Sequence, residues 1–149
     1  MKKQTWLIKE ISALETYPVR HPVLRKGRPL EDCSFEGDDL QSTIHLGLFE
    51  NENLVGVASL LKNNHPDFDS ISQYQLRGMA ILESFQGQGY GKKLLIYGEN
   101  LLKKLGVELI WFNAREKAIP FYLDSGYSIL GNSFEIKGIG THFMMFKTL

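Results

Sequence analysis

Hydrophobic and polar positions change their period along the chain and divide it into strands, helices and an irregular arm. Residues 4–11 (QTWLIKEI) and 71–82 (ISQYQLRGMAIL) have the short apolar pattern of strands. Residues 42–62 hold two further β-rich runs on either side of ENEN, whose asparagines tolerate turn geometry, so they predict an antiparallel hairpin. Before this hairpin, prolines at positions 18, 22 and 29 allow one short helix followed by an irregular arm.

The period changes after residue 90. Apolar residues and one glycine recur there at three- and four-residue steps, which predicts one face of an amphipathic helix that Gly106 ends. Residues 107–113 (VELIWFN) predict a buried strand, and a short helix from about Lys117 is stopped by Gly126. The last two strands are expected at 127–130 and 141–149, with residues 131–140 (GNSFEIKGIG) as their connection.

This order of elements predicts the fold class. Early antiparallel strands precede a strand–loop–helix–strand–helix series, so we expect a mixed β-sheet of the α/β or α+β type with helices on both faces. The strands flanking the long helix should be parallel, because such a crossover returns the chain in the same direction. Without a repeat or a linker, residues 1–149 read as a single domain.

Charge and composition exclude several function classes. Seventeen basic and seventeen acidic side chains cancel, so the chain lacks the positive field that drives nucleic-acid binding. No segment approaches the roughly 20 apolar residues that span a bilayer. Cys33 is the single cysteine, which precludes an internal disulfide and suits a reducing compartment. We therefore expect a soluble, cytoplasmic protein with no nucleic-acid or membrane partner.

The stretch FQGQGYGKKLL (residues 85–95) is the strongest candidate for a ligand site. A Walker A loop would need glycine in place of Gln86 and a hydroxyl in place of Lys93. A dinucleotide fingerprint would need glycine in place of Lys92 or Leu94. What remains is Q-x-x-G-x-G between a strand and a helix, where free N–H groups can bind an anion. The alternative is a glycine-rich turn without a ligand.

Two segments resemble the GNAT superfamily of acyl-CoA-dependent N-acetyltransferases. Residues 77–95 (RGMAILESFQGQGYGKKLL) are similar to its strand, pyrophosphate loop and helix. Residues 113–127 (NAREKAIPFYLDSGY) are similar to its second signature, A-x-x-F-Y-x-x-x-G-[F/Y]. With residues 138–149, which are similar to small bacterial members, the resemblance covers roughly residues 40–149. The arm before residue 40 matches nothing specific.

The resemblance implies a sheet that splays open between its fourth strand, about residues 73–82, and its fifth, about residues 107–113. Acetyl-CoA would lie in that gap as cosubstrate, with no metal. The implied coenzyme contacts are the backbone groups of Met79, Ala80 and Ile81, the loop residues Gln86, Gly87, Gln88, Gly89, Tyr90, Gly91 and Lys92, and Asn113. Asn113 is equally well explained as a helix N-cap.

Acetyl transfer needs a general acid, a general base and stabilisation of the thioester oxygen. The resemblance assigns the acid to Tyr122, and a backbone N–H of the fourth strand would meet the oxygen. The base stays open: His142 is the best candidate because the last strands border the acceptor pocket in the family. Glu135, Asp69 and a water chain are the alternatives.

The leading hypothesis is an enzyme that transfers an acetyl group to a primary amine of a small molecule by direct attack in a ternary complex. The alternatives are a protein amine as acceptor and an acyl-CoA-binding module without turnover. The arm is basic in its first part and acidic in its second, so the charge of the acceptor stays open. The final strand, residues 141–149, either completes the sheet of the monomer or meets a partner in a homodimer.

Overall fold

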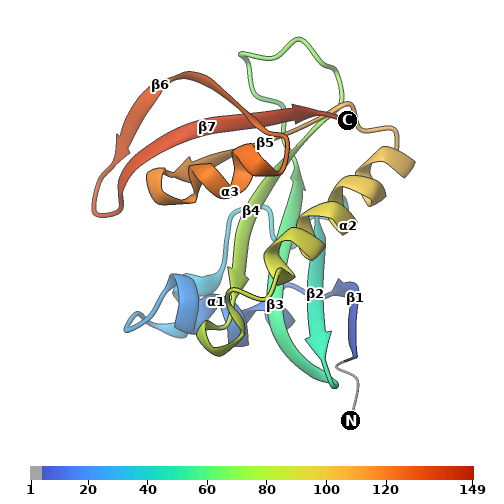
Figure 1. Cartoon of the computed structure of the whole chain (residues 1–149), viewed down its shortest axis with the longest axis vertical. Coiled ribbons are helices and arrows are strands. Elements are labelled where there is room, and N and C mark those ends of the chain that lie inside the picture. The colour runs from blue at the N-terminus through green and yellow to red at the C-terminus, as the bar shows by residue number, and fades with distance from the viewer. Residues whose placement is uncertain (1–4) are drawn as a thin grey trace. The chain divides into compact units, whose positions relative to one another are not determined.

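The computed structural model describes residues 5–149, which form two compact units. The first comprises the chain up to Lys62 together with Leu76–Leu101, and the second comprises Asn63–Gln75 and Leu102–Leu149. The strands are β1 (Trp6–Ile11), β2 (Ile44–Glu50), β3 (Asn53–Lys62), β4 (Gln73–Ile81), β5 (Leu109–Arg115), β6 (Ser128–Ile136) and β7 (Gly140–Thr148), and the helices are α1 (Tyr17–Leu24), α2 (Tyr90–Lys104) and α3 (Ile119–Asp124) (Figure 1). No helix in this part of the chain is long and apolar enough to cross a bilayer.

The first unit contains strands in the order β1-β2-β3-β4. Antiparallel ladders join β1 to β2 and β2 to β3, which confirms the predicted hairpin. Asn51 (φ 48°) and Glu52 (φ 72°) form its two-residue turn. Two successive positive φ angles are the geometry that suits the twist of a tight hairpin, and an asparagine tolerates it readily.

Helices cover both faces of this part of the sheet. Successive side chains of β3 point to opposite faces. On one face, Val57 packs with Val19 of α1 and with Ala80. On the other face, Leu60 lies against Gly98 of α2, where an added Cβ would come within 3.3 Å of its Cδ1. The expected arrangement of helices on both faces is therefore confirmed for the first unit.

The second unit contains strands in the order β4-β5-β7-β6. β4 and β5 are parallel, as predicted, and pair through Gln73 with Leu109, Tyr74 with Ile110, and Gln75 with Trp111. The remaining ladders, β5 with β7 and β6 with β7, are antiparallel. The result is a mixed α/β architecture.

The connection before β5 corrects one predicted boundary. Gly106 has a left-handed φ of 80°, and its N–H bonds to the carbonyl of Lys103. The N–H of Val107 bonds to the carbonyl of Leu102. This pair of bonds is the Schellman motif that closes a helix. Val107 is therefore part of the end of α2, and the strand runs two residues later than predicted, to Arg115.

The connection predicted at residues 131–140 is wrong for most of its length. β6 continues from Ser128 to Ile136, so the segment is mainly strand. The sequence GNS looks like a turn, but Gly131, with φ 78°, lies at a register shift between Leu130 and Phe134. The extra residues are accommodated as a bulge, after which pairing with β7 resumes.

Candidate functional site

The glycine-rich loop connects β4 to α2. It follows the 3₁₀ helix η3 (Glu83–Phe85) and ends where α2 begins at Tyr90. Gly87 and Gly89 both have left-handed φ angles, 79° and 80°. A Cβ at either position would meet no atom within 4 Å. These glycines are therefore required by the backbone conformation, and the space beside them is open to a ligand.

The start of α2 presents free backbone donors. The first helical hydrogen bond runs from the N–H of Lys93 to the carbonyl of Gly89, at 3.1 Å. The N–H groups of Tyr90, Gly91 and Lys92 consequently have no acceptor within the helix, and they carry its partial positive charge. Gly91 does not have a positive φ, so its conformation is one that any residue adopts. Its backbone conformation therefore does not explain why this position holds a glycine.

Gln86 fastens the loop to the end of β4. Its Nε2 donates to the carbonyl oxygen of Ile81 at 2.9 Å. That carbonyl was predicted to pair with the coenzyme, and a carbonyl oxygen can accept a second hydrogen bond beside the one from Gln86. Met79 is half-buried, and Ala80 is buried in the cluster with Val19. Gln88 and Lys92 are exposed.

The side chain of Tyr90 points into the protein. It is buried, and its hydroxyl donates to the Glu50 carboxylate at the end of β2. This hydrogen bond, together with burial, raises the pKa of Tyr90 to about 12. Of the predicted contacts of Tyr90 with the coenzyme, only the main chain remains available. Sequence analysis did not identify Glu50, which fixes the start of α2 on the sheet.

We expect Tyr90→Phe to lower the free energy of unfolding by about 2 kcal/mol, because a buried hydrogen bond to a charged group is lost. Urea denaturation followed by circular dichroism measures this change. Tyr97→Phe is the matched control, since Tyr97 is an exposed tyrosine on the same helix. Equal stabilities of the two variants would show that the contact with Glu50 does not anchor the loop.

Tyr122 lies on α3 in a group of aromatic rings. Its ring centroid is 4.3 Å from that of Phe112, 4.9 Å from Phe121 and 5.9 Å from Tyr127. Burial raises the pKa of Tyr122 to about 12. Its hydroxyl has no hydrogen-bond partner among residues 5–149. The phenol is thus protonated at neutral pH, and its O–H is not used by the fold.

His142 lies on β7 and is buried, with a ring stacked on Phe134 at 5.9 Å between centroids. Its Nδ1 is 2.9 Å from the carbonyl oxygen of Gly140. A carbonyl only accepts, so Nδ1 carries a proton and Nε2 of the neutral ring keeps its lone pair. That atom is the one able to accept a proton.

The strand register separates the two predicted catalytic side chains. Arg115 faces His142 across the ladder, and Asn113 faces Met144. Asn113 and His142 therefore share one face of β5 and β7. Phe112, which contacts Tyr122, points to the opposite face. Tyr122 and His142 thus belong to different faces of this part of the sheet and do not form a contacting acid–base pair.

The other base candidates are less suited to the task. Glu135 is exposed on β6, and its Oε1 accepts a hydrogen bond from Thr141 at 2.5 Å. Asp69 is exposed in the segment between β3 and β4. His142 stays the preferred prediction. Within residues 5–149, no group of three or more His, Cys, Asp or Glu side chains could hold a metal ion.

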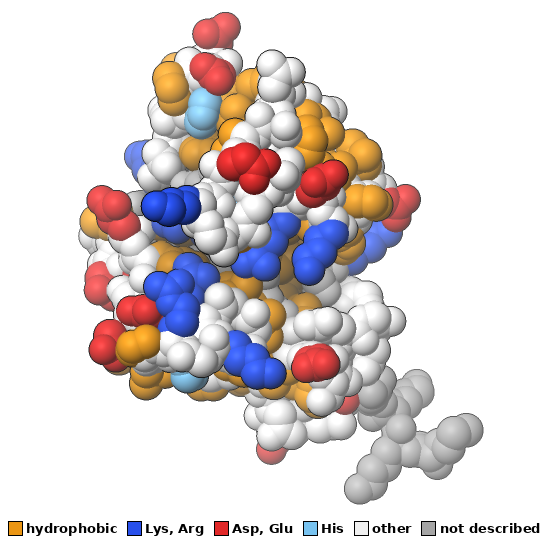
Figure 2. Space-filling model, turned by 90° about the vertical axis from the view of Figure 1, so that its left-hand side faces the viewer, with side chains coloured by type: hydrophobic (Ala, Val, Ile, Leu, Met, Phe, Trp, Pro, Cys, Tyr) orange, Lys and Arg blue, Asp and Glu red, His pale blue; other side chains and the backbone are white. Residues whose placement is uncertain are grey.

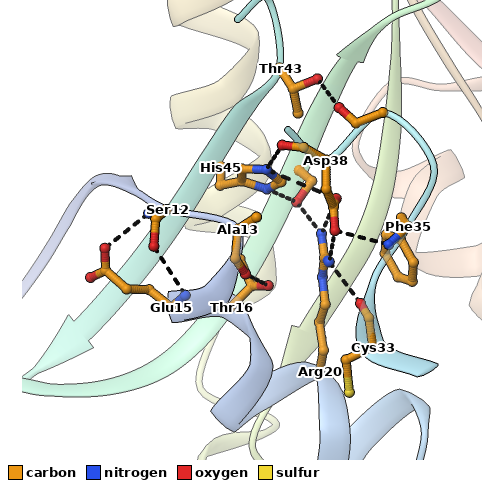
Figure 3. A network of polar contacts seen from close by, with 12 residues as sticks. Ser12, Ala13, Glu15, Thr16, Arg20, Cys33, Phe35, Asp38, Thr43 and His45 are labelled. Atoms are coloured by element: carbon orange, nitrogen blue, oxygen red, sulfur yellow. Dashed lines mark hydrogen bonds and ion pairs between the residues drawn. The ribbon is translucent and has the colours of Figure 1, made fainter. Parts of the chain in front are cut away.

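The arm contributes a buried polar network that sequence analysis did not find (Figure 3). Arg20 donates to both carboxylate oxygens of Asp38, at 2.7 and 3.0 Å, and to Ser59 Oγ at 2.9 Å. His45 lies 2.7 Å from Ser59 Oγ through Nδ1 and 2.9 Å from the carbonyl of Asp38 through Nε2. Its partners stand 7 to 39 positions apart in sequence, so no local sequence pattern predicts the network.

Known proteins resemble this chain along most of its length. Residues 8–127 match the model of the acetyltransferase (GNAT) family. An uncharacterised N-acetyltransferase, YitI of Bacillus subtilis, is 38% identical over 142 residues, which are 95% of either chain. The family match begins at residue 8 and so includes the arm, for which the sequence resemblance had found nothing specific.

Solved structures share the fold at low identity. A putative N-acetyltransferase from Lactobacillus plantarum has a TM-score of 0.76 at 17% identity and covers 99% of both chains. An aminoglycoside 6'-N-acetyltransferase complexed with coenzyme A has a TM-score of 0.75 at 16% identity, over 95% of this chain and 96% of that one. Together with the family match, these similarities show that the chain belongs to the GNAT family and is an acetyl-CoA-dependent N-acetyltransferase that acts on an amine.

Proposed function

We propose that this enzyme transfers the acetyl group of acetyl-CoA directly to a primary amine of a small molecule, with both substrates bound at once in the cytoplasm. The observation that carries the proposal is the start of α2. Three N–H groups lack helical acceptors there, beside two left-handed glycines that face open space. This arrangement suits the diphosphate of the coenzyme.

We assign some polar groups to binding the coenzyme and others to moving protons. Backbone groups of Met79, Ala80 and Ile81 bind the amides of the pantetheine arm, and the exposed side chain of Asn113 contributes a further polar contact. His142 Nε2, directly or through water, takes a proton from the ammonium form of the acceptor. The freed amine nitrogen then bonds to the thioester carbon and loses its second proton to water, and the carbon–sulfur bond breaks.

Tyr122 supplies the remaining proton. Its O–H hydrogen-bonds to the departing sulfur and protonates the thiolate, and solvent then reprotonates the phenol. With a pKa of about 12, the resting phenol is a weaker acid than an ordinary tyrosine. The apolar surroundings that cause this shift also raise the pKa of a thiol placed beside the phenol. The pKa of the CoA thiol is therefore closer to that of Tyr122 in the site than it would be if the thiol kept its value in water.

Thiol release from acetyl-CoA in the presence of an amine panel tests the activity, and calorimetric titration with CoA tests binding. We expect CoA to bind and at least one small amine to be acetylated with release of one thiol per amide formed. Binding without turnover of any amine would favour an acyl-CoA-binding module. Turnover of peptide amines alone would favour a protein substrate.

Gly91→Ala separates a ligand site from a structural turn. Because Gly91 does not have a positive φ, alanine should leave the free energy of unfolding unchanged or raise it by about 0.5–1 kcal/mol. The added methyl group should nevertheless weaken CoA binding, by about tenfold, which corresponds to roughly 1.4 kcal/mol. Asn100→Ala, at an exposed position of α2, is the control and should leave CoA affinity unchanged. Undiminished affinity in Gly91→Ala would count against close approach at this turn.

A further inference from the structure

Three arginines surround one aromatic ring in the first unit. The guanidinium carbons of Arg20, Arg77 and Arg25 lie 3.9, 4.8 and 5.3 Å from the centroid of Phe35. The acidic groups that act on Arg77 are those of Asp38 and Glu36, and Arg20 already binds both oxygens of Asp38. The cluster therefore has an excess of positive charge. The face drawn in Figure 2 does not share this bias as a whole, since both signs of charge occur on it.

Arg77 differs from its neighbours in having no acceptor. Arg20 donates to Asp38, and Arg25 donates to the carbonyl oxygens of Asp32 and Leu24. Arg77 makes no hydrogen bond or ion pair with any residue from 5 to 149, although it is half-buried. A guanidinium has five N–H donors, and those of Arg77 are not among the fully buried unpartnered atoms, so they are accessible to an acceptor from outside the protein. Burial is also what lowers the pKa of Arg77 from its usual value.

The backbone of β4 directs Arg77 toward this cluster. Gly78 has a left-handed φ of 62°, and a Cβ there would lie 2.6 Å from Phe35 Cε2. Arg77 and Gly78 thus face the same ring although they are consecutive, which a regular strand does not allow. The Nε of Arg20 lies 3.4 Å from the same Cβ position. In the described part of the chain, this Nε of Arg20 is the one buried side-chain nitrogen or oxygen without a hydrogen-bond partner.

We infer that Arg77 binds an anionic group of the acceptor, so that the substrate is a small amine that also carries a carboxylate or a similar anion. This inference rests on the proposed function. Arg77 is two residues from Met79, where the proposed contacts with pantetheine begin. The pantetheine arm next to Met79 is uncharged, and the coenzyme diphosphate, which lies beyond that arm, is assigned to the loop after β4. The anion at Arg77 therefore comes from the other substrate.

Matched amines test this inference in the thiol-release assay. We would compare β-alanine with β-alaninamide at equal concentrations of unprotonated amine, with phosphoethanolamine as the phosphate probe and putrescine as the cationic one. The two anionic amines, β-alanine and phosphoethanolamine (called the acids below), should be better substrates than the amide by at least about tenfold in kcat/KM. Arg77→Gln should lower kcat/KM for the acids by about 10- to 100-fold, the range for losing a charge-assisted pair, and change it for the amide by less than about threefold.

Two further variants show whether charge or geometry is responsible. Arg28→Gln removes a charge from the exposed pair with Asp32 in the same arm and should change kcat/KM by less than about twofold. Arg77→Lys keeps the charge without the planar donor fork and should give an intermediate value for the acids. All variants should bind CoA with unchanged affinity.

Preference for the amide or for putrescine, or an equal loss for acid and amide in Arg77→Gln, would overturn the inference. So would CoA binding by a preparation that acetylates none of the anionic amines. Loss of CoA binding in the unmodified protein is a different result, because it would overturn the proposed function itself.

Discussion

Replacing Asp38 with alanine is expected to lower the free energy of unfolding by about 3–5 kcal/mol, because a fully buried guanidinium would lose its counter-ion. The side chain of Arg20 is 0% exposed and that of Asp38 is 2% exposed. Asp38 also accepts a hydrogen bond from the backbone N–H of Phe35 at 2.9 Å, so the arm would lose this bond as well. Guanidinium denaturation at neutral pH measures the loss.

Asp39→Ala is the control, since Asp39 is the exposed neighbour and should cost little. A loss below about 1 kcal/mol in Asp38→Ala would mean that water or a rearranged arm compensates Arg20.

Acid should weaken the same interaction. Burial alone would raise the pKa of Asp38, but the hydrogen bonds from Arg20 and Phe35 and the charges of Arg20 and His45 lower it overall. A carboxyl group whose folded pKa lies below its unfolded value stabilises the protein above the unfolded value of about 3.9. That stabilisation disappears as the pH falls toward the folded pKa. The difference between the unmodified protein and Asp38→Ala should therefore shrink below about pH 4.

Replacing Tyr122 with phenylalanine is expected to lower kcat by about 10²- to 10³-fold, because the departing thiolate loses its proton donor. The hydroxyl has no hydrogen-bond partner in residues 5–149, so its removal breaks no contact within the fold. The affinity for CoA should stay within about threefold, and the stability should not fall. Steady-state thiol release together with CoA titration measures both quantities.

Tyr127→Phe makes the same chemical change in the same aromatic group, where Tyr127 is buried, and should leave kcat within about threefold. If Tyr122→Phe also stays within that range, water supplies the proton and Tyr122 serves only in packing against Phe112.

Local sequence signals accounted for much of the fold. The hairpin, the long helix with its glycine cap and the parallel pair of strands all follow from periodicity and turn residues in elements that succeed one another along the chain. The predicted boundaries of strands were wrong where a residue type that is typical of one structure occurs in another. Gly131 resembles a turn residue but lies in a bulge, and Val107 resembles a strand residue but belongs to the end of α2.

The candidate site was predictable only where it is local. The glycine loop is contiguous, so its free N–H groups could be expected from the sequence. Arg77 could not be singled out, because its environment depends on Phe35, which lies 42 positions earlier in the chain, and on the left-handed backbone of Gly78. The separation of Tyr122 from His142 required the strand register, which no spacing in the sequence provides.

Backbone N–H groups at the start of α2 are proposed to bind the coenzyme diphosphate, and amide NMR reports on these groups directly. Titrating ¹⁵N-labelled protein with CoA should shift the resonances of Gly89, Tyr90, Gly91 and Lys92, whereas pantetheine, which lacks the diphosphate, should leave them in place. Resonances that do not move at saturating CoA, or that move equally with pantetheine, would contradict a diphosphate site at this turn.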